Sequence, residues 1–535
     1  MPEEGVETIV AALRRVAARD RRRAAVVSPG GRLNYGDLDD LSDAAAKGLL
    51  AVGLRPGDRV VFLVPPSAAM MVAAFAVAKA GLVPVLVDPG MGLPQVRRCL
   101  AEAEPVALLG VPRAVWAGYF LGWGGRGLRW RIAVGGWAPP GALRWRKVLA
   151  AGRSAARELP EISPEDQAAI AFTSGSTGPP KGVIYTHGMF VSQAELLRQA
   201  FDLQPGEVDL ATFPLFALFD PYWEMTAVFP RMDFTRPGRA DPREIARAMV
   251  ENRVTHMFAS PALLDRFGAW AAARGLSFPA VRRILSAGAP VGARILRTTL
   301  RLLQGEAEVY TPYGATEALP LSSIGARERL ALGDRPGFGI CVGYPLTGVE
   351  AEIIRITDEP VEEWDPGWRV ETEEVGELVV WGGNVSPGYF RRPDADRAGK
   401  VRRNGRIGHR MGDLVRRDGA GRWWFCGRKS HRVLTPQGPI FPVTLECIFN
   451  AHPGVRRCAV VGLGDGPVRE PVLCVEGVPR SRQEGLGREL LQLAAAHPLA
   501  AQIRRVFFFG RFPVDARHNA KIRREVLAEW VRRRA

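Results

Sequence analysis

The chain has 535 residues, of which 47% are hydrophobic and 24% charged, and its formal net charge is +16. That length is too great for one hydrophobic core, so we expect two or more domains of ordinary globular composition. The longest apolar run, 68–78, is too short for a membrane helix, and the scattered cysteines argue against a zinc site or a disulfide framework.

The excess of positive charge raises the question of a nucleic-acid partner. Arginine is spread along the whole sequence, and Ala, Gly and Pro are abundant, as GC-rich coding would give. ATP or an acidic substrate also suits a positive field, so we expect no nucleic acid to bind. The acidic start, Met1-Pro2-Glu3-Glu4, lacks the basic region of a signal peptide, and we expect a cytoplasmic location.

Helical and strand patterns alternate in the first part of the chain. Two segments with helical spacing alternate with two short apolar runs, which predicts a βαβ unit with a parallel sheet. The predicted elements are a helix over 37–52, a strand over 60–64, a helix over 67–80 and a strand over 83–87.

A second α/β system is predicted after residue 187. Apolar residues share one face of a helix over 187–201. An Asp-Pro pair supplies the N-cap and first turn of a helix over 241–252. A strand over 254–259 and a helix over 294–304, closed by Gly305, complete the pattern.

In the last third the sequence is richer in short β-type runs, separated by Gly and Pro. We expect strands within 348–356, 376–381 and 421–426. A compact α+β tail follows from about residue 429 and closes with a basic helix over 522–534.

Tryptophans recur every seven residues at Trp116, Trp123, Trp130 and Trp137, with Trp145 nearby and several arginines between them. Gly-Gly and Pro-Pro pairs in the segment forbid one continuous heptad helix. Separate core and turn positions are the first interpretation. The alternative hypothesis is an amphipathic surface for peripheral contact with a membrane, an acyl chain or a partner protein.

The loop 173–182, Thr-Ser-Gly-Ser-Thr-Gly-Pro-Pro-Lys-Gly, is the most informative segment. Its glycines let backbone N–H groups approach an anion closely, its hydroxyl groups donate to phosphate oxygens, and its lysine adds a point charge. It joins two apolar runs, 168–172 and 183–185, that we expect to be strands. The pattern predicts a phosphate-binding loop.

This loop differs from a Walker A motif, in which Gly-Lys-Ser/Thr opens a helix. Here Pro180 precedes Lys181, Gly182 follows it, and a strand comes next. A plain Ser/Gly linker is the alternative, but linkers seldom carry this order of residues between two apolar runs.

Further motifs follow the loop in a fixed order. With them the sequence resembles the adenylate-forming enzymes, the superfamily of acyl-CoA synthetases, luciferase and peptide-synthetase adenylation domains, over nearly the whole chain. The motifs are Ser286-Ala287-Gly288-Ala289-Pro290, Tyr313-Gly314-Ala315-Thr316-Glu317, Gly376-Glu377-Leu378, Gly412-Asp413, Gly427-Arg428-Lys429 and Asn519-Ala520-Lys521.

The resemblance implies an α/β fold. A large N-terminal AMP-binding domain, 1–427, would hold two doubly wound α/β subdomains and a small β-subdomain. A small, mobile α+β C-terminal domain, 428–535, would carry a catalytic lysine, Lys521.

The reaction implied by the family is attack of a carboxylate on the α-phosphorus of ATP, which gives an acyl-adenylate and pyrophosphate. Because two anions must meet, the site must supply positive charge and donors. Thr316 would contact the α-phosphate, and Glu317 would hold Mg²⁺, a hard ion suited to oxygen ligands. Lys521 would counter the charge that builds during the transfer. The residues implied for the other phosphates are Thr173, Ser174, Gly175, Ser176, Thr177, Gly178 and Lys181.

Separate residues recognise the nucleoside in this family. Tyr313 would stack on one face of the adenine, Asp413 would accept both ribose hydroxyls, and Arg428 would assist it. The residues implied for the opposite wall of the adenine are Gly288, Ala289 and Pro290.

The hinge segment departs from the coenzyme A ligases. Those enzymes commonly have an acidic pair after Gly-Arg-x, followed by a Gly-x-Arg. Here Ser430 and His431 replace the acidic pair, and no arginine follows Gly438. We therefore do not expect coenzyme A to be used.

Four segments, 214–220, 311–317, 427–431 and 517–521, resemble one branch of the superfamily, the β-lactone synthetases of bacterial long-chain olefin biosynthesis. The implied substrate is a 2-alkyl-3-hydroxy fatty acid. Its own hydroxyl would attack the activated carbonyl, so that AMP leaves and a four-membered lactone closes without an external nucleophile. Other enzymes of the olefin pathway are the implied partners.

Phe216 and Phe219 fall where the family has its aromatic acyl pocket, with a core strand as the alternative for each. Asp220 and His187 are candidates for orienting the hydroxyl, without a geometric reason in the sequence. Two other functions stay open. One is an acyl-CoA or acyl-carrier-protein ligase, and the other is an inactive binding or assembly subunit, disfavoured because the motif residues are all present.

Overall fold

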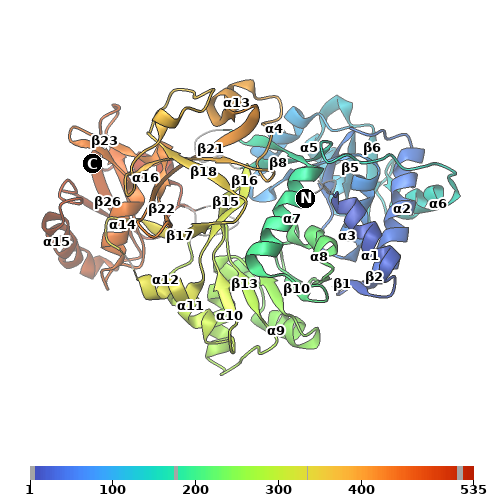
Figure 1. Ribbon diagram of the computed structural model, residues 1–535, viewed down its shortest axis with the longest axis horizontal. Coiled ribbons are helices and arrows are strands. Elements are labelled where there is room, and N and C mark those ends of the chain that lie inside the picture. Colours follow the sequence, from blue (N-terminus) through green and yellow to red (C-terminus); the bar gives the residue numbers. More distant parts are fainter. Residues whose placement is uncertain (1–6, 174–178, 334, 515–521) are drawn as a thin grey trace.

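The computed structural model describes residues 7–173, 179–333, 335–514 and 522–535. Two sheets covered by helices form the N-terminal part, an antiparallel sheet follows, and a smaller α/β part ends the chain (Figure 1). No helix of the described residues is long and apolar enough to cross a bilayer.

The first sheet is parallel except for its last strand, which returns as a hairpin. The predicted βαβ unit is confirmed, because the strands on either side of helix α3 (Ala68–Lys79) are parallel neighbours. In spatial order the strands are β7 (Leu143–Arg144), β6 (Trp130–Ala133), β5 (Ala107–Gly110), β3 (Arg59–Leu63), β4 (Val83–Val87), β8 (Gln167–Thr173) and β9 (Lys181–Thr186).

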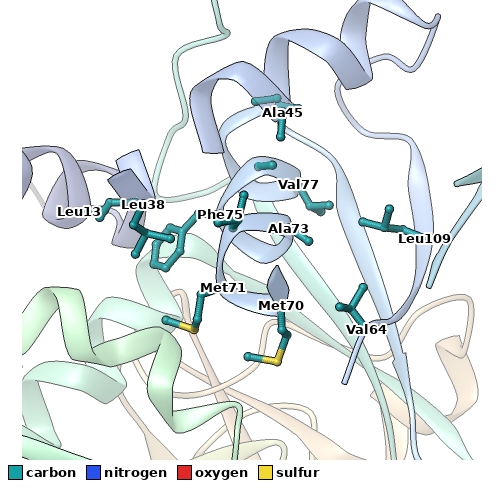
Figure 2. Packing of buried hydrophobic residues seen from close by; sticks show 14 of the residues in the cluster. Leu13, Leu38, Ala45, Val64, Met70, Met71, Ala73, Phe75, Val77 and Leu109 are labelled. Atoms are coloured by element: carbon teal, nitrogen blue, oxygen red, sulfur yellow. The ribbon is translucent and has the colours of Figure 1, made fainter. Parts of the chain in front are cut away.

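One face of this sheet packs on a helical layer in which α3 is central. Phe75 and Met71 of α3 are buried among Leu13 and Leu38 of the neighbouring helices (Figure 2). The layer consists of α1 (Ile9–Arg19), α2 (Tyr35–Ala51), α3 and α6 (Trp145–Ser154), and a second cluster under α4 (Leu93–Ala103) and α5 (Pro112–Leu121) fills the other face.

Helices α2 and α6 approach each other at two glycines. A Cβ atom at Gly48 would lie 1.9 Å from the Val148 carbonyl oxygen, and one at Gly152 would lie 1.7 Å from that of Ala44. Glycine costs helix propensity, and here the close contact between the two helix backbones requires it.

The second sheet contains the predicted second α/β system and an addition from the N-terminus. Strand β1 pairs in parallel with β11, so the start of the chain completes a sheet whose other strands come from 208–310. In order they are β14 (Glu308–Tyr310), β13 (Arg283–Leu285), β12 (His256–Phe258), β10 (Val208–Ala211), β11 (Thr226–Val228), β1 (Ala24–Ser28) and β2 (Gly31–Asn34). Its helices are α7 (His187–Phe201), α8 (Asp220–Trp223), α9 (Pro242–Glu251), α10 (Pro261–Ala272), α11 (Ala293–Leu300) and α12 (Ala326–Leu332).

Two boundaries in this sheet differ from the prediction. Helix α11 ends at Leu300 rather than at 304, because Leu302 and Leu303 turn into the core and the carbonyl of Leu302 accepts a hydrogen bond from Phe278. Strand β12 is shorter than 254–259, because only its central residues pair with both neighbours.

The β-rich region forms one antiparallel sheet. The strands at 350–354 and 376–381 lie within the predicted segments, and the strand at 423–428 overlaps the third predicted segment. Its strands are β15 (Tyr313–Ala315), β16 (Ala318–Ser323), β17 (Ile340–Pro345), β22 (Trp423–Arg428), β21 (Arg406–Arg417), β19 (Gly376–Trp381) and β18 (Glu350–Ile354), with β20 (Lys400–Arg403) paired to β21 and α13 (Pro393–Gly399) beside it.

The C-terminal part has hydrophobic clusters of its own, around Phe449 and around Val461. Strand β22 runs through residue 427 to Arg428, and the division at 427/428 stays a prediction. The elements are β23 (Val433–Thr435), β24 (Gly438–Ile440), α14 (Pro442–Asn450), β25 (Cys458–Leu463), β26 (Glu470–Glu476), α15 (Arg480–Ala496), β27 (Val506–Phe509) and α16 (Arg524–Arg532).

The tryptophans of 116–145 lie in separate elements, as the first interpretation predicted. Trp116 is on α5, Trp130 is in β6, and Trp145 opens α6 and is buried. Trp123 follows α5 in a turn, and Trp137 lies in the loop after β6 with 51% of its surface exposed.

Candidate active site

The predicted phosphate loop connects the β8–β9 hairpin. Thr173 ends β8 and lies directly opposite Lys181, the first residue of β9, so both occupy the mouth of the loop. The predicted loop residues Ser174, Gly175, Ser176, Thr177 and Gly178 lie outside the described residues, as does Lys521.

A second hairpin, β15–β16, carries Thr316 and Glu317 in its turn. The hairpin needs glycine at Gly314, where a Cβ atom would lie 2.9 Å from the Ala318 carbonyl oxygen. The hydroxyl of Tyr185, on β9, donates to the backbone carbonyl of Thr316 at 2.7 Å. The turn is thereby fixed against the strand that follows the phosphate loop.

The loop 384–390 connects the two hairpins. The backbone N–H of Ser386 donates to the Glu317 carbonyl at 2.8 Å, and its hydroxyl donates to the Ile184 carbonyl at 2.9 Å. The N–H of Phe390 donates to the Gly182 carbonyl at 2.7 Å. Three segments far apart in the sequence thus meet at the predicted phosphate end of the site.

Tyr389 lies at the centre of this meeting point. Its hydroxyl donates to Oε1 of Glu317 at 2.8 Å, and the Lys181 ammonium lies 5.0 Å from its ring centroid. Burial and the Glu317 carboxylate raise the pKa of Tyr389 well above its ordinary value, so the phenol keeps its proton and serves as a donor.

A further cation, Lys400 of β20, lies 5.7 Å from the same ring centroid and donates to the Ser386 carbonyl at 2.6 Å. Burial lowers the pKa of Lys400 to about 8, against the opposing pull of Glu317 and Asp396. Sequence reasoning missed Tyr389 and Lys400, because neither falls at a diagnostic spacing from the phosphate loop.

The predicted ribose group is assembled across two adjacent strands. Asp413 on β21 is the direct cross-strand neighbour of Arg428 on β22, and their Oδ1 and Nε atoms are 2.9 Å apart. The Tyr313 hydroxyl donates to Oδ2 of Asp413 at 2.5 Å. Burial and this carboxylate raise the pKa of Tyr313 well above its ordinary value, while Asp413 raises the pKa of Arg428.

The structure therefore brings Tyr313, Asp413 and Arg428 together, while their roles toward the adenine and the ribose stay predictions. The Glu317 charge also raises the pKa of Arg428. This interaction links the Tyr313–Asp413–Arg428 group electrostatically to the phosphate end.

The predicted adenine wall lies in the loop after β13. Gly288 adopts a left-handed φ of +90°, and the half-buried Ala289 and the exposed Pro290 follow it. Gly288–Pro290 form no hydrogen bond with the described residues of the ribose group, so their link to it is an expectation only. Ala287, just before them, packs on an aromatic cluster.

That aromatic cluster contains both predicted pocket residues. The Phe216 ring stacks on Phe258 with centroids 4.4 Å apart, and Phe219 meets Phe190 at 5.9 Å. Phe190 also contacts Tyr185 at 5.0 Å, so the cluster reaches the residue that holds Thr316. Phe219 is buried and Phe216 is half-buried.

Asp220 and His187 face no open space in this conformation. Their exposed fractions are 1% and 2%. Burial and nearby Asp209 raise the pKa of Asp220 well above its ordinary value, and burial lowers the pKa of His187 to about 4. His187 is therefore uncharged at neutral pH, and both side chains are buried away from an incoming substrate.

No three His, Cys, Asp or Glu side chains gather into a metal site within the part of the chain that is described. Mg²⁺ often binds through only one or two carboxylates, with phosphate oxygens and water as its other ligands. Glu317, a hard oxygen donor fixed by Tyr389 at the phosphate end, fits that requirement.

Comparison with known proteins identifies the family of the chain. The family model described as AMP-binding enzyme matches residues 13–390. The chain is 44% identical to the olefin beta-lactone synthetase of Xanthomonas campestris pv. campestris, across 98% of this chain and 97% of that protein.

Two solved structures share the fold. An amide bond synthetase from Marinactinospora thermotolerans superposes with a TM-score of 0.79 at 23% identity, over 98% of this chain and 99% of that one. The o-succinylbenzoate coenzyme A synthetase of Bacillus subtilis, in complex with ATP and magnesium ion, superposes with a TM-score of 0.75 at 22% identity, over 96% and 98%. The chain belongs to the family of AMP-binding enzymes, the AMP-forming ligases.

Proposed function

We propose that the protein uses ATP to activate a 2-alkyl-3-hydroxy fatty acid and then closes it to a β-lactone. The observation that carries the proposal is the 44% identity, over nearly the full length of both chains, to an olefin beta-lactone synthetase. Ser430 and His431, in place of the acidic pair of the coenzyme A ligases, support the same branch.

In the first step a carboxylate oxygen of the substrate bonds to the α-phosphorus of ATP, and the bond from that phosphorus to the β-phosphate oxygen breaks. Pyrophosphate leaves and an acyl-adenylate remains. Lys181, with Thr173 and the residues of the loop 174–178, would bind the leaving phosphates. Mg²⁺ at Glu317 would neutralise part of their charge.

In the second step the 3-hydroxyl oxygen bonds to the carbonyl carbon. The hydroxyl proton passes to solvent, the bond from the carbonyl carbon to the phosphate oxygen breaks, and AMP leaves with the electron pair. Attack within one molecule needs no external thiol, because the nucleophile is already held next to the carbonyl. Coenzyme A is therefore not a substrate in this proposal.

The other roles follow the motif assignments. Asp413 and Arg428 would hold the ribose, Thr316 would contact the α-phosphate, and Lys521 would stabilise the transferring charge. The residues proposed for the adenine are Tyr313, Gly288, Ala289 and Pro290. The aromatic cluster of Phe216 and Phe219 would contact the acyl chain. We also propose that the protein works with other enzymes of the olefin pathway and that it is located in the cytoplasm.

The deciding experiment is product analysis. The protein is incubated with ATP, Mg²⁺ and a 2-alkyl-3-hydroxy fatty acid, with and without coenzyme A, and the products are identified by mass spectrometry. We expect β-lactone and AMP in both reactions. A thioester that forms only with added coenzyme A would establish the alternative, an acyl-CoA ligase.

A further inference from the structure

Helix α5 carries an aromatic pair on its outer face. The rings of Trp116 and Phe120, one helical turn apart, stack with centroids 5.5 Å apart and planes at 16°. Phe120 exposes 80% of its surface, whereas Val115 and Gly118 of the same helix are buried against the sheet. A single exposed apolar ring is ordinary on a protein surface, whereas a cluster of such rings marks an interaction site.

A third aromatic residue lies beside this helix. The loop after β6 follows α5 closely, with Gly135 against the Pro112 ring and the Tyr119 hydroxyl donating to the Pro140 carbonyl at 2.9 Å. Trp137, between these two contacts, is 51% exposed. Trp116, Phe120 and Trp137 therefore belong to one region of the surface, which we term the α5 surface.

The charge of this region has a single sign. Residues 105–144, which end where α6 begins on the opposite face of the sheet, include five arginines and no aspartate or glutamate. Arg113 on α5 and Arg97 and Arg98 on α4 are exposed. None of these three forms an ion pair with another described residue.

The acidic residues at the end of α4 do not neutralise the surface. Glu102 pairs with Arg392 at 2.5 Å, and Glu104 pairs with Arg391 at 2.6 Å. Both carboxylates are thus already bound by arginines outside the region.

We propose that the α5 surface docks the protein on the anionic headgroups of a lipid bilayer, with Trp116, Phe120 and Trp137 at the interface. Tryptophan and phenylalanine beside basic residues are the combination that interfacial helices use, because the rings enter the boundary while cations attract anionic lipids. The absence of any carboxylate over the 40 consecutive residues 105–144 matches a uniformly negative surface such as a layer of anionic headgroups. This docking does not depend on the proposed chemistry.

Co-sedimentation of the full chain with phosphatidylcholine vesicles, with or without phosphatidylglycerol, tests the proposal. We expect binding to the anionic vesicles only, weakened by salt. Arg97→Gln, Arg98→Gln and Arg113→Gln together should reduce the partition coefficient by at least about tenfold. Phe120→Ser should reduce it several-fold by removing the apolar insertion.

Matched controls lie on helices of the second sheet or directly after one of them. Arg243→Gln, Arg297→Gln and Arg301→Gln remove the same net charge, and Val250→Ser replaces another exposed apolar residue, on α9. These variants should bind as the unmodified protein does, and thermal unfolding should show that all variants are folded. Absence of binding to anionic vesicles, or equal losses in the control variants, would overturn the proposal. Capture of an acidic protein without vesicle binding would overturn it as well.

Discussion

Tyr389 donates its phenolic proton to Oε1 of Glu317 over 2.8 Å, although 72 residues separate them in the chain. The tyrosine also lies against two ammonium groups, those of Lys181 and Lys400. One side chain thus fixes the proposed magnesium ligand and contacts both cations at the phosphate end. We infer that Tyr389 is a positioning residue for Glu317.

Replacement of Tyr389 by phenylalanine tests this inference. The ring that contacts Lys181 stays, and only the hydrogen bond to the carboxylate is lost. A hydrogen bond to a charged group contributes about 1.5–3 kcal/mol, so the Mg²⁺ concentration for half-maximal ATP–pyrophosphate exchange should rise by about tenfold or more. Saturating Mg²⁺ should restore most of the rate.

The control for this variant is Tyr344→Phe. The Tyr344 hydroxyl donates a hydrogen bond to the exposed Glu328, away from the proposed site. It should leave the magnesium dependence unchanged. A lower rate for Tyr389→Phe that no concentration of Mg²⁺ restores would contradict the positioning role.

The ribose assignment is tested by Asp413→Asn with two nucleotides. Asp413 pairs with Arg428 and accepts from Tyr313, and we propose that it also accepts the ribose hydroxyls. The unmodified protein should bind ATP about tenfold more tightly than 2′-deoxy-ATP, and the variant should lose that preference, because an amide is a weaker acceptor than a carboxylate. Calorimetric titration measures both affinities. Equal discrimination by both proteins would contradict the assignment.

Lys521→Ala tests the lysine predicted from the sequence alone. Loss of one group that stabilises transition-state charge typically costs about 10²–10³ in rate, so adenylate formation should fall by that factor. ATP affinity should change little. The neighbouring Arg523→Ala, which removes an exposed cation of the same tail, should stay active. Full activity of the lysine variant would remove Lys521 from the mechanism.

The buried carboxyl group of Asp209 should make the stability of the protein depend on pH. Burial raises its pKa from an ordinary 3.8 to about 8, and its Oδ1 lies 3.8 Å from Nε2 of His256. Between these two pH values the folded state holds a proton that the unfolded chain has released. The free energy of unfolding should therefore fall as pH rises through this window, by up to about 1.4 kcal/mol per pH unit.

Asp209→Asn removes that proton uptake while keeping the shape of the side chain. Urea unfolding from pH 5 to pH 9 should show a shallower decline for the variant and greater stability at the alkaline end. Asp40→Asn, at an exposed carboxyl group, should keep the original slope. An unchanged slope for Asp209→Asn would mean that this carboxyl ionises normally.

Short segments of the sequence were enough to predict a βαβ unit and to assign several candidate site residues. The alternation of helical and strand patterns predicted the βαβ unit, because burial of one face imposes a period that a single segment reveals. The motif residues Tyr313, Asp413 and Arg428 were assigned from short segments, and cross-strand pairing of β21 and β22 then brought them together.

Only the tertiary structure decided which side chains support these motifs. Tyr389 reaches the site because the loop 384–390 meets two hairpins from earlier in the chain, and Lys400 of β20 donates to that loop. No local pattern encodes that meeting. The N-terminal strand β1 likewise joins a sheet built from residues 208–310. Contacts between distant segments depend on how whole elements pack, whereas periodicity and loop chemistry are properties of neighbouring residues.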